Sequence, residues 1–373
     1  MERMKVTPWS VEGKVNYEHL IKEFGVSPIT DELISRIRKI TGEVHLQLRR
    51  KIFFAHRDLD FILDKYERGE KFVLYTGRGP SGPVHIGHIV PWIFTKWLQE
   101  KFGVKLYFQV TDDERFLYNP SRQLSKEEIQ KYVYDNILDV IAIGFDERKT
   151  EIVVNTKAAG ALYNIAIEVA RHVTLSTVKA IFGFKDEDNI GIVFFPAIQA
   201  APAFLESKLT GVNAPCLIPA AIDQDPYWRM TRDVAPKIGY YKPAQIHSRF
   251  LPALTAGGKM SASIPESAIY LKDSDEEVEY KIMNAFTGGR ATKKEQKKLG
   301  GQPEICSIYQ FFSFLFEEND EELMERYTAC RSGELLCGEC KAELTSRIKK
   351  FLHQHRKKRE KAKDKIDEFL FKG

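Results

Sequence analysis

The sequence predicts an α/β protein in which a doubly wound, Rossmann-like parallel sheet is followed by an α-helical C-terminal domain. Two patterns support this fold class. Short β-type runs alternate with helical stretches over residues 71–275, and helical patterns dominate from about Glu276 onward. The length of 373 residues is about two and a half times a typical domain of ~150 residues. We therefore expect three parts: a helical extension over 1–70, the sheet domain over 71–275 and the helical domain over 276–373.

The elements follow from apolar spacing along the chain. In the first 70 residues, helical periodicity predicts helices at Tyr17–Phe24, Asp31–Thr41 and Arg57–Arg68. Four β-rich runs predict strands at Phe72–Thr76, Lys105–Val110, Glu151–Val154 and Leu217–Ile222. Helices are expected between and after them at 86–101, Lys126–Ile143, Gly160–Phe182 and Pro226–Ile238. Strands that alternate with helices in this way favour a parallel sheet with helices on both faces.

The composition is that of a globular protein, with 43% hydrophobic and 29% charged residues. Apolar runs are short or interrupted, and none approaches the ~18 residues of a membrane span. The first 30 residues are charged and lack the apolar core of a secretory signal. We therefore expect a cytoplasmic protein without a membrane segment.

Positive charge is concentrated at the C-terminal end. Between Lys341 and Gly373 twelve Lys and Arg stand against five Asp and Glu, a net +7, so the remaining chain carries −3 of the total of +4. A basic C-terminal helix is suited to a polyanion such as nucleic acid. The alternative is a solvated helix face with internal ion pairs.

A glycine-rich loop follows the first strand of the sheet domain. Gly77-Arg78-Gly79-Pro80-Ser81-Gly82 satisfies the G-x-G-x-x-G fingerprint, but Pro80 and Pro83 prolong the loop, which argues against a dinucleotide oxidoreductase. His85 and His88 then lie three residues apart where the helix begins, a geometry suited to an anion. Gly87 leaves room for a ring to approach the backbone. Capping or core histidines, or less readily a zinc pair, are the alternatives.

A second polar loop lies far downstream, at Gly257-Gly258-Lys259-Met260-Ser261-Ala262-Ser263. Its two glycines can act as a hinge, and it presents an ammonium group and two hydroxyls. Without other evidence, a mobile surface turn is the better explanation of such a Gly-Gly-Lys segment.

Taken together, the two loops resemble a known family. Pro80–His88 and Lys259–Ser263 resemble the two signature sequences of class I aminoacyl-tRNA synthetases, the second in its Lys-Met-Ser-Ala-Ser variant. Three further blocks resemble the tryptophanyl-tRNA synthetases of archaeal and eukaryotic type: Gln109–Glu114, Phe195–Pro202 and Ala221–Tyr227. The resemblance covers roughly residues 70 to 345 and is specific as a set.

The resemblance implies ATP-dependent formation of tryptophanyl-adenylate, followed by transfer of tryptophan to tRNA. It implies catalytic roles for His85, His88, Lys259 and Ser261, which would stabilise the charge that builds up on the phosphates. Contacts to ATP, which arrives with Mg²⁺, are expected from Arg78, Gly79, His85, Gly87, His88, Gln224, Lys259, Met260 and Ser261. Residues 71–275 would then be the catalytic domain and 276–373 an anticodon-binding domain. A homodimer is expected by the same resemblance.

For tryptophan, the resemblance places Tyr75 and Gln109 at the indole and Glu114, Gln199 and Gln224 around the ammonium group. Tyr75 as a core residue and Glu114 as a helix-capping acid are the alternatives. Arg290 is expected to contact tRNA, although Ala291 stands where eukaryotic relatives have Asp.

Two other functions share part of these features. Tyrosyl-tRNA synthetases have the same fold and both signatures, but Asp223-Gln224-Asp225-Pro226-Tyr227 is typical of the tryptophan enzymes. Small-molecule adenylyltransferases share the His-x-Gly-His element alone, and a basic helical C-terminal domain is foreign to them.

Four of the five cysteines form a C-x₂₃-C-x₆-C-x₂-C pattern: Cys306, Cys330, Cys337 and Cys340. Four thiols with a close C-x₂-C pair are suited to Zn²⁺ or an iron–sulfur cluster. The spacing also resembles that with which some tryptophanyl-tRNA synthetases hold a [4Fe–4S] cluster. Free thiols and disulfides remain the alternatives, and Cys216 is interpreted as a core residue.

Overall fold

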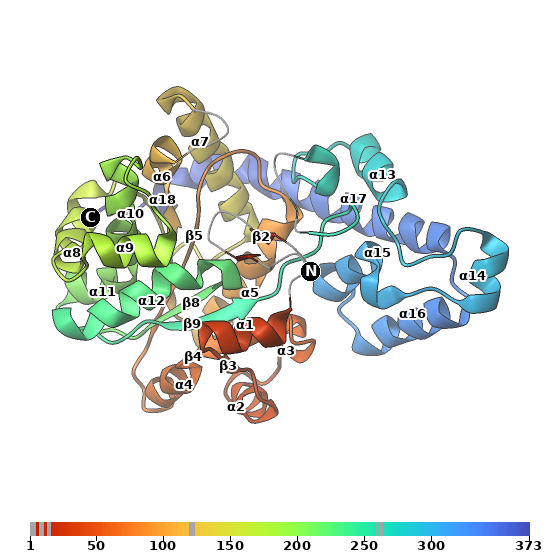
Figure 1. Cartoon of the computed structure of the whole chain (residues 1–373), viewed down its shortest axis with the longest axis horizontal. Coiled ribbons are helices and arrows are strands. Elements are labelled where there is room, and N and C mark those ends of the chain that lie inside the picture. Colours follow the sequence, from red (N-terminus) through yellow and green to blue (C-terminus); the bar gives the residue numbers. More distant parts are fainter. Residues whose placement is uncertain (1–4, 7–10, 13–15, 119–123, 259, 261–263) are drawn as a thin grey trace.

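The computed structural model describes residues 5–6, 11–12, 16–118, 124–258, 260 and 264–373 (Figure 1). Its main feature is a seven-stranded sheet in the order β3-β4-β9-β8-β5-β6-β7. From edge to edge the strands are β3 (Ser27–Pro28), β4 (Phe53–Arg57), β9 (Ala244–Ser248), β8 (Cys216–Ala221), β5 (Val73–Arg78), β6 (Lys105–Val110) and β7 (Thr150–Val154). A separate pair consists of β1 (Lys5–Val6) and β2 (Val11–Glu12).

Strands β9-β8-β5-β6-β7 are parallel, and the chain order reverses between β5 and β8. These two strands pair only at Val73 with Cys216 and at Leu74 with Leu217, so their carboxyl ends are not joined by the ladder. Ligands of doubly wound folds bind at such a reversal, outside the carboxyl ends of the strands. A ligand site is therefore expected beyond the strand ends at Arg78 and Ala221, and the predicted fold class is confirmed.

Alternate strand residues face two different helical layers. Leu74, Leu106 and Ile152 join the core beneath α5 (Ile86–Phe102) and α7 (Lys126–Ile143). Val73, Tyr75 and Tyr107 face the opposite layer, which Figure 1 shows in yellow-green to green. That layer contains α8 (Ala159–Ala170), α9 (Leu175–Phe182), α10 (Ile190–Ala200), α11 (Pro202–Thr210) and α12 (Asp225–Val234). Both faces are buried because consecutive strand side chains point in opposite directions.

The N-terminal segment contains the three predicted helices as α1 (Tyr17–Phe24), α2 (Asp31–Thr41) and α4 (Leu59–Glu67), with α3 (Leu46–Arg49) between them. The sequence analysis expected a purely helical segment here, and this expectation is wrong. Strand β4 pairs antiparallel with β9, and β3 pairs with β4, so this segment extends the main sheet. Residues 53–56 are buried without polar alternation, which removes the period-two signal of a half-exposed strand.

The predicted helix Gly160–Phe182 is two helices, α8 and α9. Thr174 caps α9, its hydroxyl accepting from the backbone of Thr177, so a new helix begins there. The predicted helix Pro226–Ile238 is also divided: α12 ends at Val234, and Ala235–Ile238 form a 3₁₀ turn. The other short elements are α6 (Asp112–Leu117) and the 3₁₀ turns Ile222–Gln224, Ala235–Ile238 and Pro265–Ser267.

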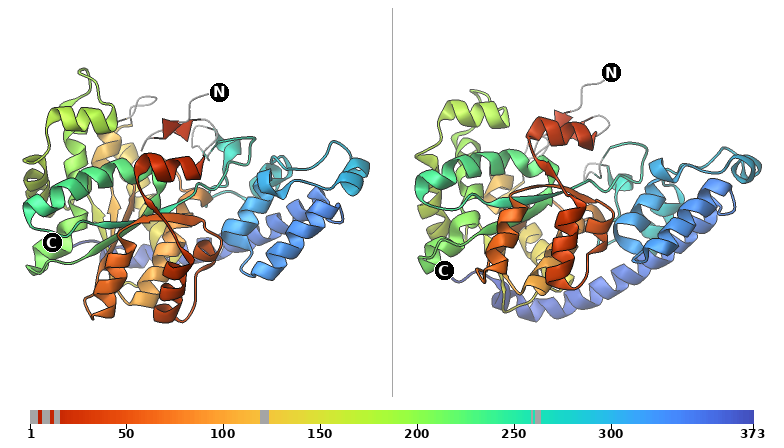
Figure 2. Two further views of the ribbon diagram at one scale, coloured as in Figure 1. Left: turned by 60° about the horizontal axis from the view of Figure 1, so that its bottom comes forward. Right: turned by 90° about the horizontal axis from the view of Figure 1, so that it is seen from below.

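The C-terminal helical region comprises α13 (Asp275–Met283), α14 (Lys293–Leu299), α15 (Ser307–Phe311), α16 (Asp320–Ser332), α17 (Cys337–Ala362) and α18 (Ile366–Phe369). Its remaining turns are Pro303–Ile305, the π-helical Phe312–Phe316 and Lys363–Lys365. Helix α17 runs back beneath the sheet domain in Figure 2. The Phe371 amide then donates to the Ile152 carbonyl at 3.0 Å, so the chain end returns to the edge strand β7.

Much of the basic charge of α17 is used in ion pairs, some with α7 of the sheet domain and some with α13 of the helical region. Arg359 donates to Asp139 at 2.8 Å and to Asp135 at 2.5 Å, both on α7. Lys349 bonds Glu279 at 2.8 Å and Arg356 bonds Asp275 at 3.1 Å, both on α13. In the described part of the chain, four exposed lysines on α17 have no partner: Lys350, Lys357, Lys358 and Lys361.

Candidate active site

The two signature segments meet at the start of α5. His85 is the N-cap residue, with an extended backbone, and its amide donates to Nδ1 of His88 at 3.1 Å. The two imidazole rings stack with centroids 3.4 Å apart. The Ile86 amide donates to the Ile269 carbonyl, and the Leu271 amide donates to the Val84 carbonyl, both at 2.9 Å. The chain that follows the second signature is therefore bonded to the first.

Gly87 is required by this packing. A Cβ atom at Gly87 would lie 3.1 Å from two atoms of the His85 ring and 3.2 Å from the Met260 sulfur. Met260 is buried, so the second signature loop is held against the histidine turn at this point. Lys259 and Ser261, which the sequence analysis names as catalytic, lie outside the described residues.

The glycine loop is held by protein groups. The Arg78 guanidinium bonds the side-chain oxygen of Asn136 and the carbonyls of Gly82 and Pro83. Burial, and then the nearby Arg115, lower the pKa of Arg78. The Arg115 guanidinium also lies over Gly79, where a Cβ would come within 2.4 Å of its Nε. Arg78 is thus turned into the protein, and the small size of Gly79 admits Arg115.

A second group of polar side chains lies at the carboxyl ends of β5 and β6. The Tyr75 hydroxyl is 2.5 Å from Oε1 of Gln109 and 2.8 Å from the backbone carbonyl of Gln199 on α10. Tyr75 and Gln109 are 1% and 0% exposed. The Trp228 ring meets Tyr75 edge-on at 5.2 Å. Tyr75 therefore contacts two other residues expected at the substrate, Gln109 through its side chain and Gln199 through its backbone.

Two residues that the sequence analysis did not select extend this group. Nε2 of Gln109 donates to Oδ1 of Asn155 at 2.9 Å, and Nδ2 of Asn155 donates to Asp113 at 2.8 Å. Burial raises the pKa of Asp113 to about 7. Asn155 directly follows β7, and a polar residue at the end of a buried strand was a usable signal. Asp113 lies within the Gln109–Glu114 block but carried no signal of its own.

The acceptor groups expected at the ammonium lie on elements that follow β6 and β8 or contact Tyr75. Glu114 is buried on α6, with its carboxylate accepting from the Thr111 hydroxyl at 2.8 Å and lying 3.7 Å from Arg115 Nε. Among the described residues, the buried Oε1 of Gln199 has no hydrogen-bond partner. Gln224 ends the 3₁₀ turn that follows β8. These oxygens come from three separate elements and favour a cationic ligand.

The turn that carries Gln224 is anchored by Asp225, a fully buried carboxylate. Arg57 of β4 donates to its two oxygens at 2.9 and 3.1 Å, and Arg229 lies at 3.2 Å. His247 of β9 lies 3.5 Å away. Burial alone would raise the pKa of Asp225, but His247 and Arg57 outweigh it and lower the pKa. The N-terminal segment thus contributes directly to the position of this turn.

Comparison with known proteins identifies the family. The model of the tRNA synthetases class I (W and Y) matches residues 67–353. The chain belongs to this family. Two curated proteins named tryptophan–tRNA ligase, from Pyrococcus abyssi and Thermococcus onnurineus, are each 54% identical over the whole chain and over 95% and 96% of their own length.

Solved structures of the family agree with this fold. The tryptophanyl-tRNA synthetase of Plasmodium falciparum superposes with a TM-score of 0.90 at 39% identity, covering 96% of this chain and 98% of that one. The tryptophan-bound structure from Encephalitozoon cuniculi gives 0.88 at 34% identity, with the same coverage of 96% and 98%. ATP as a substrate, together with Mg²⁺, is typical of this family of synthetases.

The cysteines of this class I synthetase are free thiols. Sulfur atoms of Cys337 and Cys330 occupy the space beside Gly289 and Gly301, where a Cβ would come within 2.6 and 2.8 Å of them. Burial, followed by Cys306 and Cys337, raises the pKa of Cys330 to about 11. The described residues include no group of three or more Cys, His, Asp or Glu placed to hold a metal ion.

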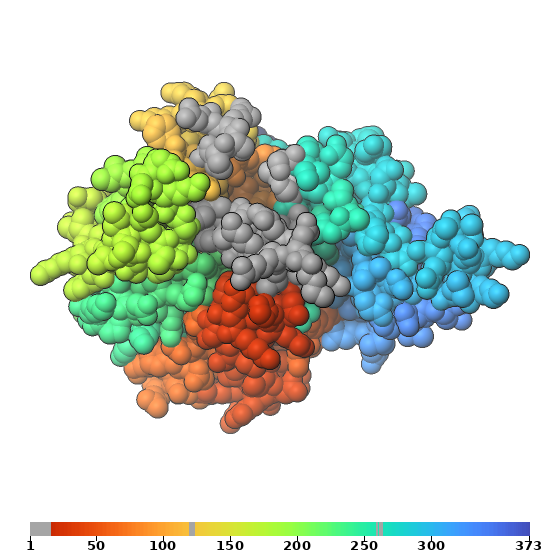
Figure 3. Space-filling model, in the orientation of Figure 1, coloured from red at the N-terminus to blue at the C-terminus, as the bar shows by residue number. Residues whose placement is uncertain are grey.

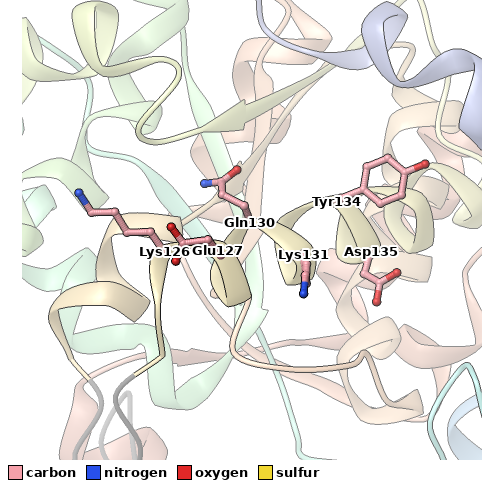
Figure 4. Close-up of a pocket in the computed structure, with 6 residues that line it drawn as sticks. All are labelled: Lys126, Glu127, Gln130, Lys131, Tyr134 and Asp135. Atoms are coloured by element: carbon pink, nitrogen blue, oxygen red, sulfur yellow. The ribbon is translucent and has the colours of Figure 1, made fainter.

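Arg290 is exposed, and its Nε donates to the Gly300 carbonyl at 2.8 Å. An open depression of about 740 Å³ lies along α7, and Figure 4 shows the side chains that line it, none of which the sequence analysis assigned to the site: Lys126, Glu127, Gln130, Lys131, Tyr134 and Asp135. No single described helix is long and apolar enough to cross a membrane, whereas the bent pair α10 and α11 meets that test by length and composition.

Proposed function

We propose that this chain activates L-tryptophan with ATP and transfers it to tRNA(Trp). The observation that carries the proposal is the buried contact of Tyr75 with Gln109 and Gln199. One hydroxyl proton faces two carbonyl oxygens, at 2.5 and 2.8 Å, so acceptor capacity remains for one more N–H. The indole of tryptophan supplies such a donor, whereas phenylalanine does not. The similar proteins named tryptophan–tRNA ligase support the same substrate.

The ATP half of the reaction uses the start of α5. The tryptophan carboxylate attacks the α-phosphorus of ATP, the bond to the bridging oxygen breaks, and pyrophosphate leaves. A carboxylate is already a nucleophile at neutral pH, so the protein has to position the reactants and stabilise charge. In this proposal His85 and His88 donate to the phosphates at the positive end of the helix dipole. Gly79, Gly87, Gln224 and Met260 line the nucleotide, and Arg78 holds the shape of the loop.

Lys259 and Ser261 complete this half of the site. They would close over the pyrophosphate as negative charge develops on it. Support comes from Met260, the sequence neighbour of both residues, whose sulfur would lie 3.2 Å from a Cβ at Gly87. Mg²⁺ enters with ATP and neutralises phosphate charge.

The ammonium group of tryptophan is assigned to Glu114, Gln199 and Gln224. The carboxylate of Glu114 supplies the opposite charge, and the unpartnered Oε1 of Gln199 supplies a buried acceptor. A buried acceptor is costly until a ligand satisfies it, so its presence favours a cationic donor at this place. Tyrosine would share this ammonium contact, and its phenolic O–H is also a donor, so the two amino acids are distinguished by direct comparison in the exchange assay.

ATP–pyrophosphate exchange with each of the twenty amino acids tests the activity. We expect exchange with tryptophan, at least tenfold weaker exchange in Gln109→Leu, and unchanged exchange in Gln130→Leu, a glutamine of α7. Exchange driven by tyrosine and not by tryptophan would overturn the assignment in favour of a tyrosyl enzyme. Adenylate formation on a small molecule without transfer to tRNA would indicate an adenylyltransferase.

The tRNA is assigned to the helical region. Four exposed lysines, which have no partner among the described residues, follow one side of α17 at helical spacing and can neutralise phosphates: Lys350, Lys357, Lys358 and Lys361. Arg290 remains a candidate contact. Reversing the charge of Lys357 and Lys361 should weaken tRNA binding and reduce its dependence on salt, while pyrophosphate exchange stays unchanged. Equal tRNA affinity of the parent and the charge-reversed variant would refute the assignment of tRNA to this side of α17.

A homodimer is assigned to the apolar face of α8, α9 and α10. Tyr163, Ile167, Leu175 and Ile190 are exposed there, and Ile190 is 87% accessible. Light scattering of the purified protein should give the mass of two chains. Ile190→Glu should give one chain, and Leu299→Glu, at an exposed position of α14, should remain dimeric. A monomeric parent protein would end this assignment.

A metal centre at Cys306, Cys330, Cys337 and Cys340 is a separate proposal. It is supported by the spacing and by the mutual influence of the thiols on their pKa values. As free thiols these cysteines do not surround a common point, so binding requires the sulfur atoms to turn toward one another. Anaerobically purified protein should absorb near 400 nm or contain zinc, and Cys337→Ser should lose either signal while Cys216→Ala keeps it. Colourless protein without metal would refute it.

A further inference from the structure

Gln109 can recognise an indole N–H only if its carbonyl oxygen, and not its NH₂ group, faces the ligand. We infer that Asn155 and Asp113 are positioning residues that fix this orientation and so determine selectivity for an N–H-bearing side chain. The inference rests on the proposed tryptophan site. It concerns residues that do not touch the substrate and act through Gln109.

We call the chain of hydrogen bonds from Asp113 through Asn155 to Gln109 the relay, and it begins at Asp113. Its Oδ1 accepts from the Glu114 backbone amide at 2.8 Å and from Nδ2 of Asn155 at 2.8 Å. A carboxylate oxygen can only accept, so Asn155 must present its NH₂ group to this side. Oδ1 is occupied by two donors, and a proton taken up by this carboxyl therefore goes to Oδ2. The direction imposed on Asn155 is the same in both protonation states.

The direction is then passed to Gln109. Because the NH₂ group of Asn155 faces Asp113, its Oδ1 faces the other way and accepts from Nε2 of Gln109 at 2.9 Å. The Oε1 of Gln109 consequently points to the Tyr75 hydroxyl at 2.5 Å. Turning the Gln109 amide over would place its carbonyl oxygen against the carbonyl oxygen of Asn155, and turning the Asn155 amide over would place its carbonyl oxygen against the Asp113 carboxylate. Each link thus has one favourable orientation.

Water cannot replace these bonds readily, because Gln109 and Asn155 are 0% and 3% exposed. Their backbones are also held. Gln109 is paired with Val153 in the β6–β7 ladder, and the Asn155 amide donates to the Val110 carbonyl at 3.1 Å. A Cβ at Gly77 would lie 2.6 Å from the Gln109 carbonyl, so β5 closes the other side. The side-chain amide therefore depends on Asn155 for its orientation.

Loss of Asn155 would leave Nε2 of Gln109 without an acceptor, and the amide would turn toward any oxygen within reach, including the Tyr75 hydroxyl. An NH₂ group would then oppose the indole N–H. A substrate without that N–H would be affected far less. The ratio between the two substrates isolates orientation from general damage to the site.

Pyrophosphate exchange is measured with tryptophan and with L-β-(3-benzothienyl)alanine, in which sulfur replaces the indole N–H. We expect Asn155→Leu to lower the tryptophan-to-analogue ratio of kcat/KM by about tenfold or more. The kcat/KM for the analogue should change by less than about threefold. Asn164→Leu, at an exposed asparagine of α8, is the matched control and should keep the parent ratio. If Asn155→Leu does not fold, Asn155→Ala is used in the same way.

An unchanged ratio in the Asn155 variant, with a lowered ratio in Gln109→Leu, would overturn the relay and leave the tryptophan site intact. An unchanged ratio in both variants would overturn the role of Gln109 at the indole, and with it that part of the proposed function. Parallel losses for tryptophan and the analogue in Asn155→Leu would show a merely structural role and also overturn the relay.

Discussion

Replacement of Asp225 by Asn tests whether the buried ion cluster positions the turn that carries Gln224. The carboxylate is fully buried, and Arg57, with its side chain only 14% exposed, bonds both of its oxygens. Asparagine keeps the shape and one acceptor but leaves the Arg57 guanidinium without a counterion. Removing one partner of a buried ion pair typically costs about 3 to 5 kcal/mol.

We expect the lower part of that range, about 3 to 4 kcal/mol, because Arg229 is 42% exposed and can be solvated. An unfolding entropy of about 2.1 cal/mol/K per residue gives roughly 0.8 kcal/mol/K for this chain, so the thermal midpoint should fall by about 4 to 5 °C. The KM for tryptophan should rise as well, because Gln224 adjoins Asp225.

The assay is thermal unfolding by calorimetry, combined with pyrophosphate exchange. Arg229→Gln removes the exposed partner and should shift the midpoint by less than about 1 °C. The pKa of Asp225 is lowered in the folded state, so its contribution is present above the unfolded pKa and is lost as the pH falls through the folded pKa. The difference in thermal midpoint between the parent and Asp225→Asn should therefore become smaller at acidic pH. A midpoint within 1 °C of the parent at neutral pH would refute the argument.

Three further predictions concern single atoms. Gly87→Ala should raise the KM for ATP about tenfold, because its Cβ would press on His85 and Met260 at 3.1 to 3.2 Å, while Gly82→Ala, whose Cβ meets nothing within 4 Å, should not. The pKa of Asp113 is raised from 3.8 to about 7, so the parent protein loses stability as the pH rises between those two values. Asp113→Asn should therefore be more stable than the parent by about 2 to 4 kcal/mol at pH 8 and equal to it near pH 4. Equal denaturant midpoints of the two proteins at pH 8 would contradict this. Gly300→Ala should cost more than about 2 kcal/mol of unfolding free energy, because φ is +65° and the Cβ would lie 1.7 Å from the Arg331 carbonyl, whereas Gly338→Ala should be neutral in the same measurement.

The sheet domain was predictable because its signals are local. The runs at Lys105–Val110 and Lys126–Ile143 coincide with β6 and α7, since a buried strand and an amphipathic helix differ in their apolar spacing. Strands β4 and β9 (Ala244–Ser248) went unrecognised. The β4 run is short and buried on both faces, so it shows no alternation. The β9 run alternates apolar and polar residues over its first four positions, a usable signal that the sequence analysis did not select. The pairing of strands depends on contacts between distant parts of the chain, which the local spacing of apolar residues does not determine.

The sequence by itself determined the chemistry that this chain can offer: a histidine pair at a helix start, a glycine-hinged lysine loop, and polar residues after buried strands. Tertiary structure alone decided how these are used. It turned Arg78 inward to Asn136, and it paired much of the basic charge of α17 with acidic residues of α7 and α13. It also linked Asp113 to Gln109 through Asn155, which lies 42 residues from Asp113 and 46 residues from Gln109 in the sequence. Hydrogen-bond direction depends on which donors and acceptors meet, and that is set by the packing of β5, β6 and β7.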